Sequence, residues 1–197
     1  GAIQDCRRAG IRVMMVTGDN METAKAIGEL IGFNVTATMT GNQLDRFGES
    51  EMEDAVNRVE IFARVTPHHK LRLLQALQRR GHRVAMTGDG VNDAPALRGA
   101  DVGVAMGQRG TEVARQASDM VLRDDNFATL RDAIAEGRGI FDNIRKFIVF
   151  LLSANLGEIL IVFIGILAGR TFLPEFFGGT EKLLILTPVM LLWINIV

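Results

Sequence analysis

The sequence predicts an α/β domain with a parallel β-sheet, followed by transmembrane α-helices. Short apolar, β-rich runs alternate with amphipathic segments up to about residue 125. A pattern of helix, glycine, strand and Thr-Gly-Asp occurs twice, and residues 147–169 are almost entirely apolar. Strands that alternate with helices form parallel sheets covered on both faces, with ligands beyond the carboxyl ends of the strands. Both Thr-Gly-Asp turns are therefore expected at that edge.

Composition narrows the possible functions. The chain has 197 residues, enough for one domain with a sizeable core and an appendage. Its formal net charge of −1 gives no general attraction to nucleic acid, so no nucleic-acid partner is expected. The single cysteine, Cys6, cannot form an internal disulfide, which fits a reducing cytosolic compartment. The chain begins inside a predicted helix and ends inside an apolar run, which predicts a longer parent protein.

Residues 1–125 contain the predicted elements of the α/β domain. Continuous apolar runs predict strands buried on both faces, and apolar residues at helical spacing predict helices. The expected strands are residues 11–16, 61–65, 82–86, 101–106 and 119–122. The expected helices are residues 2–9, 21–32, 51–59, 67–80 and 111–117, and residues 33–50 are expected to form a polar loop. Within 21–32, Ala24, Ile27, Leu30 and Ile31 share one face.

A membrane-spanning segment is predicted after this domain. Residues 126–146 form an amphipathic stalk helix that continues without a strong breaker into residues 147–169. These 23 residues are enough to cross a bilayer with some tilt. The alternative, a buried helix of a soluble protein, would need a large core that this chain does not supply. Residues 170–182 are expected to form a short extracytosolic loop, and residues 183–197 to begin a second span.

The charges beside the span predict its orientation. Arg138, Arg145 and Lys146 precede it, whereas Arg170 and Lys182 beyond it are balanced by acidic residues. Because basic residues concentrate on the cytoplasmic side, the globular part is expected in the cytosol.

The stretch MTGDGVNDAPAL, residues 86–97, is the predicted centre of the chemistry. Asp89 and Asp93 stand four residues apart after a buried strand, beside Asn92. Magnesium is usually held by one or two carboxylates together with substrate phosphate, and this arrangement fits that demand. Gly88 and Gly90 would let the backbone approach a phosphate. The structural alternative is an ordinary turn in which Asp89 caps the next helix.

Other residues are weaker candidates on their own. Thr17, in the first Thr-Gly-Asp turn, offers a hydroxyl group to phosphoryl oxygens, although it could equally be a turn residue. Lys70 could act as a point charge on a transferring phosphoryl group, although most lysines on amphipathic helices are solvated. His68, His69 and His82 have no metal-ligand spacing and are interpreted as surface or hydrogen-bonded residues.

Polar residues inside the spans suggest an ion path. Glu158 is the single charge within residues 147–169, and Asn155 lies one turn earlier on the same face. A carboxylate at this depth is costly and usually faces a bundle interior or an ion pathway, although a protonated Glu could simply bond to another helix. In the second span, Pro188 frees a carbonyl group and Asn195 adds an amide, which are oxygen ligands for a hard cation.

Four motifs follow one another along the chain: TGDN, FARVTPHHK, TGDGVNDAPAL and DVGVAMG. In this order they resemble the phosphorylation domain of P-type cation-transporting ATPases. The match continues into the membrane as NLGE and LLWIN. The resemblance implies a Rossmann-like fold of the haloacid dehalogenase type, ATP as substrate and Mg²⁺ as cofactor. Within the family, the membrane residues are similar to the calcium-pump branch, which makes Ca²⁺ the favoured cargo.

The resemblance also implies roles for individual residues. Thr17, Gly18 and Asp19 would contact the phosphoryl group and nucleotide, and Lys70 would neutralise phosphoryl charge. Asp89 would ligate magnesium, Asn92 and Asp93 would complete that site, and Arg64 would lie near the nucleotide-domain contact. The transported cation would be bound by Asn155, Glu158 and Asn195. Met190 departs from the pattern, since many calcium pumps have Gln there.

The expected function is that of a fragment of an ATP-driven cation pump in a membrane. Formation and hydrolysis of an aspartyl phosphate would be coupled to ion transport, but the DKTGT segment with the phosphorylated Asp is absent. The nucleotide-binding and actuator domains and other transmembrane helices are absent too, so the fragment is expected to be inactive alone. The alternatives are a membrane-tethered phosphatase of the same superfamily and a non-enzymatic binding module.

Overall fold

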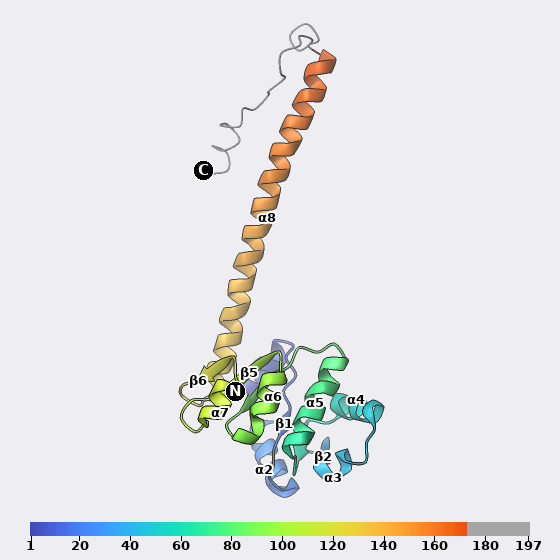
Figure 1. Cartoon of the computed structure of the whole chain (residues 1–197), viewed down its shortest axis with the longest axis vertical. Helices are drawn as coiled ribbons and strands as arrows, with labels where there is room; N and C mark the ends of the chain where they lie inside the picture. The colour runs from blue at the N-terminus through green and yellow to red at the C-terminus, as the bar shows by residue number, and fades with distance from the viewer. Residues whose placement is uncertain (173–197) are drawn as a thin grey trace. The chain divides into compact units, whose positions relative to one another are not determined.

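The computed structural model describes residues 1–172 of the protein (Figure 1). The chain divides into two compact units, Gly1–Ile134 and a second unit that begins at Ala135. The first unit is an α/β domain and the second is helical. The predicted start of a second span, residues 183–197 with Asn195, lies outside the described residues.

The α/β unit alternates strands and helices, as the sequence predicted. Its strands are β1 (Met15–Val16), β2 (Thr38–Thr40), β3 (Ile61–Ala63), β4 (Ala85–Gly88), β5 (Val102–Met106) and β6 (Met120–Leu122). Its helices are α1 (Ala2–Arg8), α2 (Met21–Ile31), α3 (Gly41–Leu44), α4 (Glu49–Arg58), α5 (Pro67–Arg79), the short 3₁₀ helix η1 (Val91–Asp93), α6 (Ala94–Gly99) and α7 (Glu112–Gln116). The last helix, α8 (Phe127–Phe172), begins in this unit and continues into the second.

The strand pairs of the described residues are all parallel, but they form two sheets of three strands. The strand orders are β1-β3-β2 and β4-β5-β6, so β1 and β4 are edge strands. Both begin later than predicted, at Met15 and Ala85, because each pairs on one side only and its ladder starts there. The parallel arrangement was therefore predicted correctly, and the division into two sheets was not.

The first sheet is covered on both faces at its central strand, β3. Phe62 packs with apolar residues of α3, α4 and α5, whereas Ile61 and Ala63 pack with Ala24 of α2 and with Phe33. The three β3 residues are fully buried. Because successive side chains of a strand point to opposite faces, helices on both sides explain an apolar run without alternation.

The second sheet has the same layered packing at β5. Val104 packs with Leu122 of β6 and Leu130 of α8, and Ala105 packs with Leu97 of α6 and with α7. The first turns of α8 are thus part of the α/β core.

The stretch of residues 33–50 is not the loop that the sequence predicted. It contains β2, which pairs with β3, and the short helix α3. The Gln43 side chain accepts the backbone N–H of Thr40 at 2.8 Å and caps α3. Elements of three and four residues are too short to give a periodic pattern, so composition alone indicated a loop.

The buried face of α2 also differs from the apolar face that the sequence suggested. Ala24 is buried, but Leu30 is 86% exposed, and Ile27 and Ile31 are also exposed. The helix instead approaches β3 through Gly28, where an added Cβ would lie 2.5 Å from Cδ1 of Ile61. A glycine gives no apolar signal, so this contact was not predicted.

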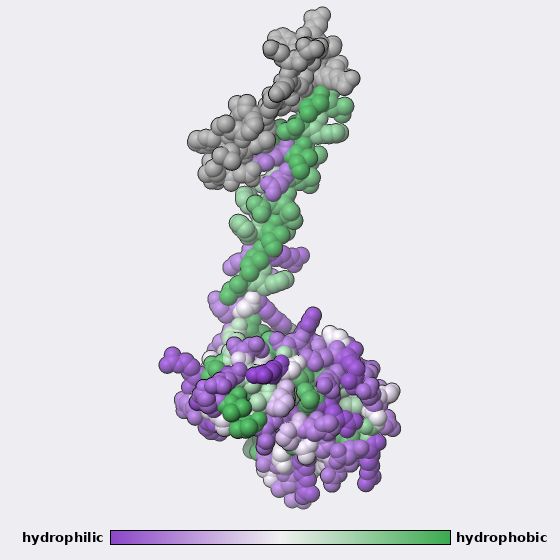
Figure 2. Space-filling model, viewed as in Figure 1, coloured by the Kyte–Doolittle hydropathy of each residue, from purple (hydrophilic) through white to green (hydrophobic). Residues whose placement is uncertain are grey.

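The second unit consists, in its described part, of α8. The helix has 46 residues, and Gly137 and Gly139 do not interrupt it. Among the described residues it is the one helix long and apolar enough to cross a membrane, and Figure 2 shows apolar surface along much of it. It extends three residues beyond Gly169, into the predicted loop. Residues 127–172 thus form one continuous helix, and the division into stalk and span stays a prediction.

Candidate functional site

The two Thr-Gly-Asp turns lie at the carboxyl ends of two edge strands, β1 and β4. Thr17 comes directly after β1, and its backbone N–H donates to the carbonyl of Phe62 at 2.9 Å. Gly88 is the last residue of β4, and Asp89 follows it. The turns thus lie where a parallel sheet binds its ligands.

The first turn is closed by contacts within itself. The Thr17 hydroxyl donates to Oδ2 of Asp19 at 3.0 Å, and it accepts the Asp19 backbone N–H at 3.1 Å. Gly18 and Asp19 are exposed, and Thr17 is half-buried. The turn therefore presents a hydroxyl and a carboxylate on an open surface.

Arg64 borders this turn in an unusual backbone conformation. Its φ is +52°, in the left-handed region that L-residues seldom adopt. Its N–H donates to the carbonyl of Asp19 at 2.8 Å, and the next N–H, of Val65, donates to Thr17 at 3.0 Å. Such conformations persist where the surroundings determine them, and they often occur at functional sites. The Arg64 side chain is exposed.

The second turn is held by a carboxylate from outside the Thr-Gly-Asp sequence. Asp93 is 5% exposed, and its Oδ2 accepts the backbone N–H groups of Asp89 and Gly90 at 3.2 and 3.3 Å. Its Oδ1 bonds to the ammonium group of Lys70. Gly88 is required by this packing, because an added Cβ would lie 2.6 Å from Cβ of Asp93.

The two predicted magnesium carboxylates are therefore in different environments. Asp89 is exposed, and its backbone carbonyl accepts the N–H of Thr111 at 2.8 Å, which anchors the turn to α7. Asn92 is also exposed. Asp93, by contrast, already has a cation and two N–H donors as partners. Asp89 is the carboxylate that is open to a metal ion.

The segment from Arg64 to Lys70 connects the two turns. Its first residues bond to the first turn, and Lys70, on the first turns of α5, bonds to Asp93 in the second. The predicted residues thus form two groups joined by the start of α5. No group of three His, Cys, Asp or Glu side chains in the described residues could hold a metal ion by itself.

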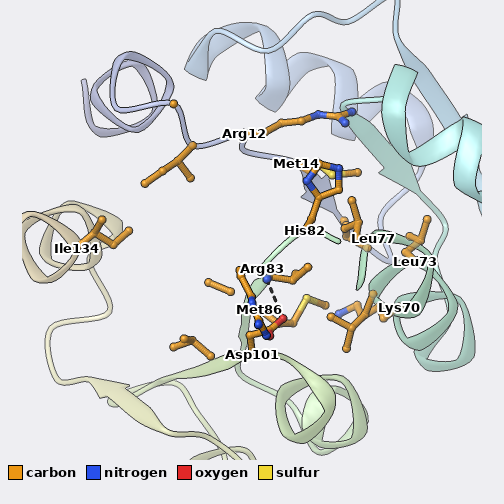
Figure 3. Close-up of a pocket in the computed structure, with 17 residues that line it drawn as sticks. Arg12, Met14, Lys70, Leu73, Leu77, His82, Arg83, Met86, Asp101 and Ile134 are labelled. Carbon is orange, nitrogen blue, oxygen red and sulfur yellow. Dashed lines mark hydrogen bonds and ion pairs between the residues drawn. The ribbon is translucent and has the colours of Figure 1, made fainter. Parts of the chain in front are cut away.

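A cavity of about 520 Å³ lies between β1 and β4 (Figure 3). Arg12, Met14 and Val16 line it from the β1 side, and residues 82–86 line it from the β4 side. Lys70, Leu73 and Leu77 of α5 form another wall, and Ile134 lies opposite them in the view. The cavity is bordered by the outer edges of β1 and β4, neither of which has a partner strand in the described residues, and Lys70 lies on its wall.

Asp101 anchors the start of β4 beside this cavity, a role that the sequence analysis did not find. It accepts from Arg83 at 2.7 Å and from the Val84 N–H at 3.0 Å, and Gln78 is a further donor at 3.3 Å. These hydrogen bonds, that of Arg83 first, lower the pKa of Asp101 to about 2. Asp101 begins the DVGVAMG motif, but the motif does not indicate this role, because the donors Gln78, Arg83 and Val84 lie in a different part of the chain.

The three histidines agree with their interpretation. His68 and His82 are exposed, whereas His69 is buried and hydrogen-bonded on both ring nitrogens. Asn155 and Glu158 belong to the second unit, in α8, where Asn155 is exposed and Glu158 is half-buried.

Family models match most of the α/β unit. A model of haloacid dehalogenase-like hydrolases matches residues 1–101, and a second model with the same description matches residues 69–134. Together they include both Thr-Gly-Asp turns and Lys70.

The chain is also similar to curated cation pumps. It is 49% identical over 198 residues to a calcium-transporting ATPase of Bacillus subtilis, covering 100% of this chain and 21% of that protein. It is 48% identical over 202 residues to an endoplasmic reticulum calcium ATPase of Aspergillus fumigatus, covering 100% and 20%. A probable cation-transporting ATPase F of Mycobacterium tuberculosis is 49% identical over 98% of the chain. The chain thus spans about a fifth of the length of these relatives.

Solved structures agree on the fold. A zinc-transporting PIB-type ATPase in an E2·Pi state superposes with a TM-score of 0.66 at 28% identity, over 83% of this chain and 23% of that one. The catalytic domain of a CPx-ATPase superposes with a TM-score of 0.51 at 26% identity, over 67% and 44%. The predicted fold class and the resemblance to P-type ATPases are confirmed. The chain belongs to the haloacid dehalogenase-like hydrolases, and along its whole length it is similar to a segment of the P-type cation-transporting ATPases.

Proposed function

We propose that this chain is the part of an ATP-driven cation pump that positions a phosphoryl group and passes the resulting movement to a membrane helix. The observation that carries the proposal is the Lys70–Asp93 ion pair beside the exposed Asp89, at the carboxyl end of β4. A buried ion pair is costly to desolvate and is weak evidence for stability alone. At a strand end in this fold, its placement fits a role in phosphoryl transfer.

Phosphoryl transfer needs positioning and charge stabilisation more than covalent help from the protein. Lys70 supplies a compact positive charge, held in place by Asp93. The Thr17 hydroxyl, once it turns away from the Asp19 carboxylate, and the exposed backbone of Gly18 would offer donors to phosphoryl oxygens. Asp19 and Arg64 lie beside them. Asn92 adds an amide at the second turn. These residues are the candidates for binding phosphate and nucleotide.

The exposed carboxylate of Asp89 fits a magnesium site. Magnesium keeps several waters and needs only one or two carboxylates when substrate phosphate completes its shell. When bound, the ion would neutralise phosphoryl charge. In this arrangement Asp93 fixes the backbone of the turn and the Lys70 side chain. Its carboxylate would also ligate magnesium through an oxygen lone pair that Lys70 and the two N–H groups leave free.

The cavity between β1 and β4 supports the proposal that the nucleophile comes from another part of the parent pump. Both walls are edges of parallel sheets, and an additional parallel strand in that space could pair with both. A carboxylate at its end would lie beside Lys70, which lines the cavity. The remaining pump domains, which supply this strand and the nucleotide pocket, are thus the expected partners.

The transport half of the proposal concerns α8. Asn155 and Glu158 are oxygen donors within the apolar stretch of this helix, and with Asn195 they are candidate ligands of the transported cation. Calcium is the favoured ion because calcium-transporting ATPases are among the relatives. The helix would sit in a lipid bilayer, with the α/β unit in the cytosol.

The test uses the parent pump that contains this segment, purified in detergent and given radiolabelled ATP. A calcium-dependent phosphoenzyme is expected, and Lys70→Ala should slow its formation by about 100-fold. Lys25→Ala, on the exposed side of α2, is the matched control and should leave the rate unchanged. No phosphoenzyme in the parent pump would refute the proposal, and an unchanged calcium requirement in Glu158→Gln would remove Glu158 as a ligand.

The same design separates the pump from a membrane-tethered phosphatase. The 197-residue chain alone is expected to hydrolyse neither ATP nor p-nitrophenyl phosphate. Magnesium-dependent hydrolysis by the chain alone, abolished by Asp89→Asn, would favour the phosphatase.

A further inference from the structure

We infer that His69 is a positioning residue that holds the start of α5 so that Lys70 reaches Asp93. Its effect on Lys70 can be measured in the chain alone. Only the consequence for phosphoryl transfer rests on the proposed function. His69 does not line the cavity and contacts no predicted ligand group, so it acts through its neighbour in the helix.

The His69 ring is bonded on both nitrogens. The backbone N–H of Thr66 donates to Nδ1 at 3.2 Å, and Nε2 lies 2.6 Å from Oδ1 of Asp45. In return, the His69 backbone N–H donates to the Thr66 hydroxyl at 3.3 Å. Histidine therefore takes the place of the Glu or Gln that usually completes a capping box at this position.

These contacts determine the tautomer. A backbone N–H can only donate, so Nδ1 must be the acceptor and carry no proton. Nε2 then carries the hydrogen and donates it to Asp45. The hydrogen bond from His69 is also the main reason that the pKa of Asp45 is lowered. A neutral ring with a defined tautomer thus joins α5 to the end of α3.

The neighbouring contacts attach α5 to the same segment. Arg72, one turn further along α5, donates to the carbonyls of Leu44 and Phe47 at 3.1 and 2.7 Å. Gly41 lies directly on the His69 ring, since an added Cβ would be 2.8 Å from Nδ1. Residues 41–47 therefore form a platform for the first turns of α5, and the buried ring is its closest packed part.

Lys70 depends on this platform because it follows His69 directly. The first backbone N–H groups of a helix have no partner within the helix, so the first turn frays unless it is capped. Loss of the ring would remove the cap from Thr66 and the link to Asp45 together. The Lys70 ammonium group, whose side chain is 18% exposed, would then spend less time against Asp93 and more time in solvent.

Competitive acetylation of lysines measures this directly in the full 197-residue chain in detergent. The bonded Lys70 should react slowly with acetic anhydride, and Lys25, exposed on α2, is an internal reference in the same molecule. In His69→Leu, the labelling of Lys70 relative to Lys25, measured by mass spectrometry, should rise about fivefold, because the two hydrogen bonds lost at His69 should affect Lys70 about as much as the direct loss of one. Asp93→Asn gives the labelling ratio that is expected when Lys70 is no longer held by a carboxylate.

Two further variants make the test specific. His69→Gln can still accept the Thr66 N–H, as in an ordinary capping box, so it should restore Lys70 labelling most of the way to the wild-type value. Asp45→Ala removes only the second bond and should give an intermediate increase, and it serves as the test if His69→Leu does not fold. Circular dichroism shows whether each variant is folded. A Lys70 ratio that rises only in variants that have lost their helical signal would reflect general unfolding and would overturn the inference.

An unchanged Lys70 ratio in folded His69→Leu, or in folded Asp45→Ala if the first variant does not fold, would also overturn it. The labelling needs neither ATP nor a pump. A positive result would therefore stand even if the parent protein formed no phosphoenzyme, and a negative result would leave the proposed function intact.

Discussion

The two Thr-Gly-Asp turns have the same three residues after a strand, yet different contacts hold them. In the first turn, the exposed Asp19 bonds to the half-buried Thr17 of its own motif. In the second, the buried carboxylate of Asp93 organises the backbone and binds Lys70. The repeated motif therefore fixes only the place of each turn in the sheet, and residues outside the motif decide what each turn can do.

The largest difference is expected when each carboxylate is removed. Asp93→Ala leaves the Lys70 charge and two N–H groups without their acceptor in a buried place, and should cost about 3–5 kcal/mol of unfolding free energy. Asp19→Ala, at an exposed position, should change it by less than about 0.5 kcal/mol. Amide hydrogen exchange at β3 and β5 of the chain in detergent measures both. Equal effects would mean that the turns are held in the same way.

The two glycines give the next largest contrast. At Gly88 an added Cβ meets Cβ of Asp93 at 2.6 Å, whereas at Gly18 the nearest atom is a backbone oxygen of Val65 at 3.9 Å. Gly88→Ala should therefore destabilise the fold by about 1–3 kcal/mol through overpacking. Gly18→Ala is the matched control, with an effect within about 0.5 kcal/mol. Calorimetric unfolding of both variants compares them, and a tolerant Gly88 would show that the second turn can shift.

The sequence predicted the parts of this comparison that depend on local pattern. Apolar runs gave the strands, and Pro67 gave the start of α5. The bond between Lys70 and Asp93 joins residues 23 apart in the chain, and no periodicity encodes it. The resemblance to a family placed both residues at the site without giving their contact. The split of the sheet was equally hidden, because a strand's partner is decided by tertiary packing and not by its own residues.

The starts of β1 and β4 are also held differently, which predicts a difference in their response to acid. Near β1, Arg12 donates to the carbonyl of Val59 at 3.0 Å, whereas near β4 the carboxylate of Asp101 is the acceptor. The folded pKa of Asp101, about 2, is below its ordinary value of 3.8. Its stabilising effect is therefore complete above that ordinary value and is lost as the pH falls through about 2.

Asp101→Asn should consequently lower the thermal unfolding temperature at pH 7, and this difference should shrink as the pH falls below 4 toward 2. Calorimetry of the two proteins at a series of pH values follows the change. Arg12→Ala is the comparison at β1. The difference between its unfolding temperature and that of the unmodified protein should stay constant over the same pH range. If the unfolding temperature of Asp101→Asn stayed lower by the same amount at every pH, the Asp101 carboxylate would not act through its charge.

The smallest effect is expected at the two threonines of the turns. The Thr17 hydroxyl both donates to the Asp19 carboxylate and accepts the Asp19 N–H. Thr17→Val should therefore lower the free energy of unfolding by about 0.5–1 kcal/mol, at the low end of the range for a hydrogen bond because the site is partly solvated. Thr87→Val, in β4, keeps the shape of the side chain and should cost less, since the backbone contacts of Asp93 hold that turn. Urea unfolding of the chain in detergent resolves differences of this size only between matched variants. A larger loss at Thr87 would reverse the comparison, because the second turn would then also depend on the hydroxyl of its own motif.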